Sequence, residues 1–356
     1  MGTGAIRSRY ENWTRGPAIA LIVALLAVLA IVSWEPAGTP APKLRASPSE
    51  HSDLQLYRDI IAGVTAGGDY YEVAAREQRS AGYPLKPFYT FRLPTQAIIY
   101  AAVGERTMRV VNWFLCAALM VAWCAMLRPL LPLPLLGAAM VLMAGGLGGL
   151  LQPVTSVFHE DWAALFLALM IVLRKPERTW PAMLAGFAAL MVRELALPMI
   201  LAMGGLALVE KRWRETAGWA AIVGIFAVYF TAHAYWVSQV VLPGDQASQG
   251  WSQMLGLKFA LKSIAKVTMG IQMPYPLVST LLILSLFGWA SVRAGWALRA
   301  FLLLTGYGAM LALFARTDTF YWALIAAPLS FVGLAFLPKV ARDLAEALRR
   351  APYPAQ

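Results

Sequence analysis

Long apolar runs dominate this chain and exclude a soluble fold. Stretches of about 17 to 22 residues, rich in Leu, Ala, Val and Met, recur along the sequence, and several end in Arg or Lys clusters. Hydrophobic residues make up 59% of the chain and charged residues only 14%, whereas charged residues approach about a quarter of a soluble domain. Runs of this kind predict transmembrane helices. We therefore expect an all-α polytopic membrane protein.

The net charge of +11 does not indicate nucleic-acid binding. Many of the Lys and Arg residues lie at the ends of apolar runs, where positive charge sets topology and meets anionic headgroups. The sequence shows no basic stripe with a nucleic-acid-binding signature. Cys116 and Cys124 share one apolar run, and we expect them to be packing residues and not a disulfide or metal site.

The basic clusters orient the predicted spans. Arg7, Arg9 and Arg15 precede the first run, which lacks a clear cleavage site, so we expect an uncleaved span with a cytoplasmic N-terminus. We predict about ten spans, a cytoplasmic C-terminus and a single integral membrane domain over 1–356. The predicted parts are the first span 17–34, a first outer loop 35–107 with juxtamembrane helices, a central bundle 108–237, a second outer loop 238–274 and C-terminal spans with a tail over 275–356.

One pair of short apolar runs favours a hairpin. In "WPAMLAGFAALMVRELALPMILAMGGLALV", a single helix would bury Arg193 and Glu194 at the membrane centre and put the basic residues after 210 outside. A hairpin keeps both basic flanks in the cytoplasm and places Arg193 and Glu194 at an outer apex.

The first outer loop contains an unusually polar stretch, "GGDYYEVAAREQRSAGYPLKPFYTFRLP". Asp69 is placed to cap a helix, with Glu72 as its capping-box partner, and "AGYP" ends that helix. Residues 54–64 predict a surface helix. Residues 97–104 are too short to span, and they predict an interfacial or re-entrant helix. In the second outer loop, Lys258, Lys262 and Lys266 recur every four residues, which predicts a basic amphipathic helix at the membrane surface.

With this topology, ionisable residues from four loops gather at the outer edge of the bundle. Polar groups near a bilayer are costly unless they serve a cavity or partner, so their convergence is a site hypothesis. Structural roles remain open for each one: capping for Asp69, Glu160 or Asp161, an ion pair for Arg193 with Glu194, and a local turn for Arg316 with Asp318. The residues of this set are Asp53, Asp59, Asp69, Glu72, Lys86, Arg92, His159, Glu160, Asp161, Arg193, Glu194, Arg316 and Asp318.

The motifs "YY..A", "PF…FR.P" and "LMVRELALP", after a first span and a large outer loop, resemble bacterial members of the GT-C superfamily of integral membrane glycosyltransferases. The resemblance covers most of residues 17–330. It implies a polyprenyl-phosphate-linked sugar as donor, inversion at the transferred sugar, a glycan or lipid acceptor of the cell envelope, and a periplasmic active site in the bacterial inner membrane.

The resemblance also implies roles for individual residues. A carboxylate of the first outer loop acts as base, and Asp69 is the residue we expect there, with Glu35 of "SWEP" as an alternative. Lys86, Arg92, Arg193 and Arg316 would hold the phosphate. Glu160 and Asp161 would bind sugar hydroxyls, act as a second acid or hold a divalent cation. The remaining substrate-binding residues that we predict are His159, Glu194, Tyr70 and Tyr89.

Three other functions stay open. A transporter or flippase would need ionisable residues within the spans and a pathway to both sides. Another lipid-processing transferase, such as an acyltransferase, would need a base beside a nucleophile, with His159 as the available base. The third alternative is a scaffold for envelope assembly.

Overall fold

The computed structural model describes residues 6–34 and 52–350, and these are helical throughout, with no strand among them. Five stretches are long and apolar enough to cross a membrane: α1 (Arg15–Ser33), α5 (Glu105–Leu127), α10 (Trp213–Val240), α13 (Gly295–Leu313) and the continuous stretch Phe320–Arg349. Shorter apolar helices are α6 (Leu133–Leu147), α8 (Trp180–Val192), α9 (Leu197–Val209) and α12 (Tyr275–Ser291). The all-helical class is therefore confirmed, and several helices have the length and composition of membrane spans, while the number of spans stays a prediction.

Helix α7 (His159–Leu173) is the centre of the bundle. Phe166 and Leu173 are its only residues that are not buried, as expected for a helix that is apolar on every side. It packs against α5, α8, α13 and the 3-10 helix η5 (Phe320–Leu329). The first residues of α7 are consequently held rigidly at one end of the bundle.

The predicted last span, 322–337, does not form a regular α-helix. Two buried 3-10 helices, η5 and η6 (Val332–Phe336), cover this stretch, and α14 (Leu337–Arg349) follows. Pro328 lies inside η5 and cannot donate an α-helical hydrogen bond. Gly333 lets η6 approach α12 so closely that an added Cβ would lie 1.9 Å from the Ser285 carbonyl oxygen.

The hairpin of α8 and α9 is confirmed. Pro198 lies in the first turn of α9, and its ring would clash with the carbonyl of Glu194 in a continuous helix. A short 3-10 turn, η3 (Glu194–Ala196), therefore replaces the α-helix. Arg193 and Glu194 lie at this break, at the opposite end of the hairpin from its basic flanks.

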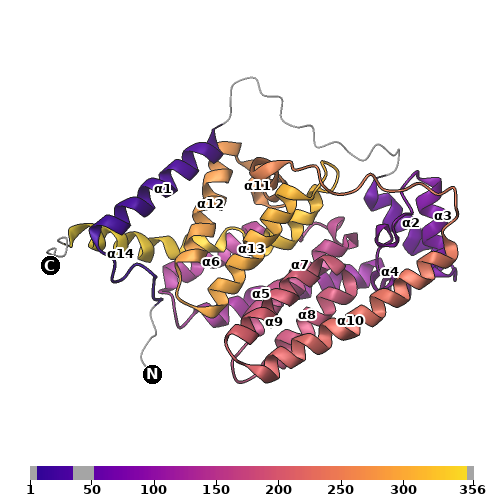
Figure 1. Ribbon diagram of the computed structural model, residues 1–356, viewed down its shortest axis with the longest axis horizontal. Helices are drawn as coiled ribbons and strands as arrows, with labels where there is room; N and C mark the ends of the chain where they lie inside the picture. Colours follow the sequence, from indigo (N-terminus) through magenta and orange to yellow (C-terminus); the bar gives the residue numbers. More distant parts are fainter. Residues whose placement is uncertain (1–5, 35–51, 351–356) are drawn as a thin grey trace.

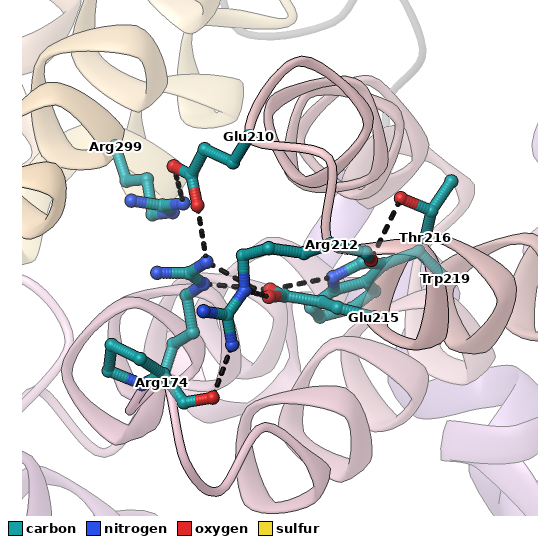
Figure 2. Close-up of polar contacts among 8 residues, drawn as sticks. Arg174, Glu210, Arg212, Glu215, Thr216, Trp219 and Arg299 are labelled. Carbon is teal, nitrogen blue, oxygen red and sulfur yellow. Dashed lines mark hydrogen bonds and ion pairs between the residues drawn. The ribbon is translucent and has the colours of Figure 1, made fainter.

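A buried ionic network closes the basic end of the hairpin (Figure 2). Arg174, after α7, donates to Glu215 of α10 at 2.7 and 2.9 Å and to Glu210, after α9, at 2.8 Å. Arg212 also donates to Glu215, at 2.6 Å, and Arg299 of α13 donates to Glu210 at 2.9 Å. The network thus ties the ends of four helices together.

Substitution of Glu215 by Gln should destabilise the fold by about 3 kcal/mol, because the nearly buried Arg174 and the partly exposed Arg212 lose their shared, buried carboxylate. Thermal unfolding in detergent measures this loss. Glu177→Gln is the matched control, since Glu177 is exposed on the loop before α8. Equal midpoints for the two variants would contradict a structural role of the network.

The outer-loop helices lie together beside the end of α10, far from α1 and α14 (Figure 1). They are α2 (Asp53–Thr65), α3 (Tyr70–Ser80), the 3-10 turn η1 (Phe88–Thr90) and α4 (Pro94–Val103). The helices predicted over 54–64, after Asp69 and over 97–104 are confirmed. The Pro/Ser-rich segment 35–51, which includes Glu35, lies outside the described residues.

Residues 241–255 form a strap across this end of the molecule. Arg79 of α3 makes a bidentate ion pair with Asp245, both distances being 2.7 Å, and this contact lowers the pKa of Asp245 to about 2. Lys86 donates its ammonium group to the Pro243 carbonyl at 2.7 Å, and its own carbonyl accepts from the Ser248 amide. These contacts hold the strap, which carries Trp251, against α3 and the loop that follows it.

Helix α11 (Gly256–Lys266) follows the strap and corrects one expectation. The amphipathic helix forms, but it packs against α13 and η5 inside the bundle. Its lysines lie over aromatic rings: Lys258 and Lys262 face Tyr275, and Lys266 lies 3.5 Å from the ring centre of Phe320. The helix therefore does not present this face as an open basic surface. Cys116 and Cys124 are free thiols, as predicted.

Candidate functional site

Arg92 lies where three elements of the outer end meet. Its Nε donates to the hydroxyl of Tyr57 of α2 at 2.8 Å, and its Nη2 donates to the hydroxyl of Tyr321 of η5 at 3.2 Å. Tyr70 of α3 donates its hydroxyl to the Arg92 carbonyl at 2.6 Å. Burial raises the pKa of Tyr57 to about 12, so its phenol stays neutral. Three tyrosines thus position Arg92 without neutralising it, and no described carboxylate pairs with it.

Arg193 is held in the opposite way. It is 1% exposed and pairs with Glu160, at the start of α7, at 2.8 Å. Its other terminal nitrogen pairs with Glu194. Two carboxylates therefore neutralise one guanidinium, and Arg193 acts as an anchor for both acids. The second carboxylate oxygen of Glu194 has no hydrogen-bond partner among the described residues.

An apolar groove runs between α9 and α13. This α9–α13 groove has a volume of about 450 Å³. The hydroxyl of Tyr307 in the groove wall donates to the Leu195 carbonyl at 2.6 Å and fixes α13 to the hairpin break. Its lining residues are Pro198, Met199, Ala202, Leu302, Thr305, Gly306, Tyr307, Ala309, Met310 and Phe314.

The groove adjoins a second cavity, which we call the arginine pocket. This pocket has a volume of about 320 Å³ and shares Met310 and Phe314 with the groove. Arg92, Arg193 and Glu194 supply its charged groups. Its other lining residues are Tyr89, Leu195, Phe230, Trp251 and Trp322. An apolar groove therefore lies beside a pocket that contains Arg92, an arginine with no ion-pair partner among the described carboxylates.

A third cavity lies on the other side of Arg92. This tyrosine pocket shares Arg92 and Trp251 with the arginine pocket. Tyr83 donates to Asp53 in its wall at 2.6 Å, and Arg316 pairs with Asp318 at 3.0 and 2.6 Å. Its lining residues include Asp53, Tyr57, Tyr70, Gln78, Tyr83, Thr90, Trp251, Arg316, Asp318 and Tyr321.

The structure brings together most of the residues predicted for the site. Arg92, Arg193, Glu194 and Tyr89 line the arginine pocket, and Tyr70 and Arg316 line the tyrosine pocket. Glu160 lies behind Arg193 as its ion-pair partner. His159 is buried behind the site, with its ring 5.1 Å from the ring of Tyr57.

Like Glu160 and His159, three further predicted residues line none of these cavities. Lys86 is engaged with the strap. Asp161 is fully buried on another side of α7, where it faces the side chains of Asn112 and Thr155. Asp69 is exposed and accepts hydrogen bonds from the amides of Tyr71 and Glu72 at 2.9 and 3.2 Å. The predicted capping role of Asp69 is confirmed.

Sequence reasoning placed Asp53 at the outer edge but assigned it no role, and it missed Tyr57, Tyr321 and Trp251. The four-residue spacing of Asp53 and Tyr57 in a predicted helix was an available signal, since it puts both on one face. No group of three or more potential metal ligands occurs in the part of the chain that the structure describes. Glu160 and Asp161, the pair considered for a divalent cation, face different neighbours.

In comparisons with known proteins, no family model, curated protein or solved structure matches the chain.

The cap predicts a stability effect at Asp69. Asp69→Ala should cost about 1 kcal/mol of stability, because two amides at the start of α3 lose their acceptor. Asp69→Asn is the matched control and should stay close to the wild type, since the Asn side-chain oxygen also caps well. Thermal unfolding in detergent compares the two. A larger loss in the Asn variant than in the Ala variant would contradict the capping role.

Proposed function

We propose that this chain is a glycosyltransferase of the bacterial inner membrane that uses a polyprenyl-phosphate-linked sugar as donor. It transfers the sugar, with inversion, to an envelope glycan or lipid at the periplasmic face. The observation that carries the proposal is that the apolar α9–α13 groove adjoins the arginine pocket, with Met310 and Phe314 in both linings. A polyprenyl phosphate matches this arrangement, since its long apolar chain suits the groove and its phosphate suits the arginine.

Arg92 is the residue we assign to the phosphate. A guanidinium already paired with carboxylates gains little from a further anion, whereas the Arg92 guanidinium carries a full positive charge and donates only to neutral hydroxyls. As the bond between the sugar and the phosphate breaks, negative charge grows on the leaving oxygen, and Arg92 stabilises it. Arg193 holds Glu194 in the wall of the same pocket.

The acceptor needs a base, and we assign this role to Asp53. Asp53 lies in the first outer loop, lines the tyrosine pocket and faces the donor site across Arg92. Asp69, which the resemblance suggested, is engaged in capping α3 and lines neither pocket. A base on the tyrosine-pocket side would take the proton of an acceptor hydroxyl while that oxygen attacks the sugar.

Arg92→Ala should weaken the binding of polyprenyl phosphate at least about tenfold, because a hydrogen bond to a charged group is worth about 1.5–3 kcal/mol. Binding to purified protein in detergent measures the effect. Arg316→Ala is the matched control, since Asp318 already neutralises Arg316, and it should change the affinity much less. Equal losses in both variants would contradict the assignment of Arg92.

Asp53→Asn should lower acceptor-dependent release of polyprenyl phosphate from the donor about 100-fold, the usual scale for loss of a general base. Asp69→Asn should retain activity. The reverse pattern would return the role of base to Asp69. A transporter, flippase or scaffold would release no polyprenyl phosphate in the wild type, which would refute the proposed function itself.

A further inference from the structure

We infer that the acceptor is a neutral carbohydrate whose terminal sugar ring binds in the tyrosine pocket. This inference rests on the proposed function and narrows it, because the acceptor could otherwise be a lipid, a peptide or an acidic polymer.

The first argument is the kind of surface that the pocket offers. The side chains of Tyr57, Tyr70, Tyr83, Tyr321 and Trp251 line one small cavity, and Tyr83 and Trp251 are the more exposed of them. A flat aromatic ring gives large, rigid contact area at low conformational cost. The C–H face of a sugar ring is apolar and packs against such surfaces, while its hydroxyls point sideways. The pocket therefore suits a ligand with flat apolar faces and polar edges.

The second argument is the distribution of charge. Arg316 is neutralised by Asp318, and the hydroxyls of Tyr57 and Tyr321 already accept from Arg92. The cation left without a carboxylate among the described pocket residues is Arg92, which the donor phosphate occupies. Asp53 supplies carboxylate oxygens, which accept hydrogen bonds from hydroxyl groups and repel anions. A phosphate or carboxylate on the acceptor would therefore be disfavoured.

The third argument is the absence of a second lipid path into this pocket. The aliphatic side chains that line it are Leu56, Ile60 and Ala74, which are single residues on α2 and α3. They do not form a continuous channel comparable to the α9–α13 groove. Among the described residues, the tyrosine pocket is thus built for a polar ligand, and the lipid chain belongs to the donor alone.

The resulting transfer is chemically balanced. The acceptor hydroxyl oxygen forms a bond to the anomeric carbon of the donor sugar, and the bond from that carbon to the phosphate oxygen breaks. The hydroxyl proton goes to Asp53, and the electron pair of the broken bond stays on the phosphate at Arg92. Trp251 lines both pockets and lies at the boundary where the two sugars meet.

The test uses wild-type protein with its lipid-linked donor and a panel of simple acceptors. The panel contains methyl glycosides of the common neutral hexoses and pentoses, uronic acids, phospholipid vesicles and a neutral peptide. At least one neutral glycoside should accelerate release of polyprenyl phosphate, and the other classes should not. Acceleration by vesicles, peptide or uronic acids instead would overturn the inference, as would a panel in which no neutral glycoside has an effect.

A variant links this result to the pocket. Tyr83→Leu should raise the apparent KM for the active glycoside about tenfold and leave polyprenyl phosphate binding unchanged, because Tyr83 does not line the arginine pocket. Tyr235→Leu is the control, since Tyr235 is exposed on α10 away from the pocket. Equal KM values in both variants would place the acceptor elsewhere. Failure of the wild type to bind polyprenyl phosphate would instead refute the proposed function.

Discussion

The end of this protein where α2, α3 and η5 meet depends on an arginine that is positioned by hydroxyl groups. Tyr57, Tyr70 and Tyr321 come from α2, α3 and η5, and all three bind Arg92. A carboxylate partner would position the guanidinium equally well but would neutralise it. Phenols with raised pKa values hold its geometry and leave its charge available. Arg193 lines the same pocket but has two carboxylate partners, so its charge is not available to a further anion.

The scaffold brings these two arginines to one pocket through separate constraints. Pro198 breaks the hairpin and fixes Arg193 and Glu194 at its apex. The buried helix α7 begins with His159 and Glu160 beside the apex of the hairpin. Glu160 therefore pairs with Arg193, and the His159 ring packs against Tyr57. At the other end of the bundle, the network around Glu215 keeps the same helices in register. The site therefore relies on contacts at both ends of the hairpin.

Local and topological features of the sequence predicted much of this arrangement. The basic residues that flank the two short apolar runs predicted the hairpin, and capping chemistry predicted α3. The spacing of apolar residues predicted α2, and the spacing of the lysines predicted α11. Long-range contacts escaped prediction. Nothing near Tyr321 in the sequence indicates that it meets Arg92. Residues 322–337 have the composition of a span, but most of them form buried 3-10 helices, in which Gly333 packs closely against Ser285 and Gly288 of α12. Asp69 and Asp53 are both acids of the first outer loop, and only the fold shows that Asp53 lines a pocket.

A structure of the protein with bound polyprenyl phosphate, determined by electron cryomicroscopy in a lipid nanodisc, tests the account most directly. The account predicts the prenyl chain in the α9–α13 groove and the phosphate within hydrogen-bond distance of the Arg92 guanidinium, with the Arg193 ion pairs intact. A phosphate bound at Arg193 or Arg316, or a prenyl chain outside the groove, would contradict it.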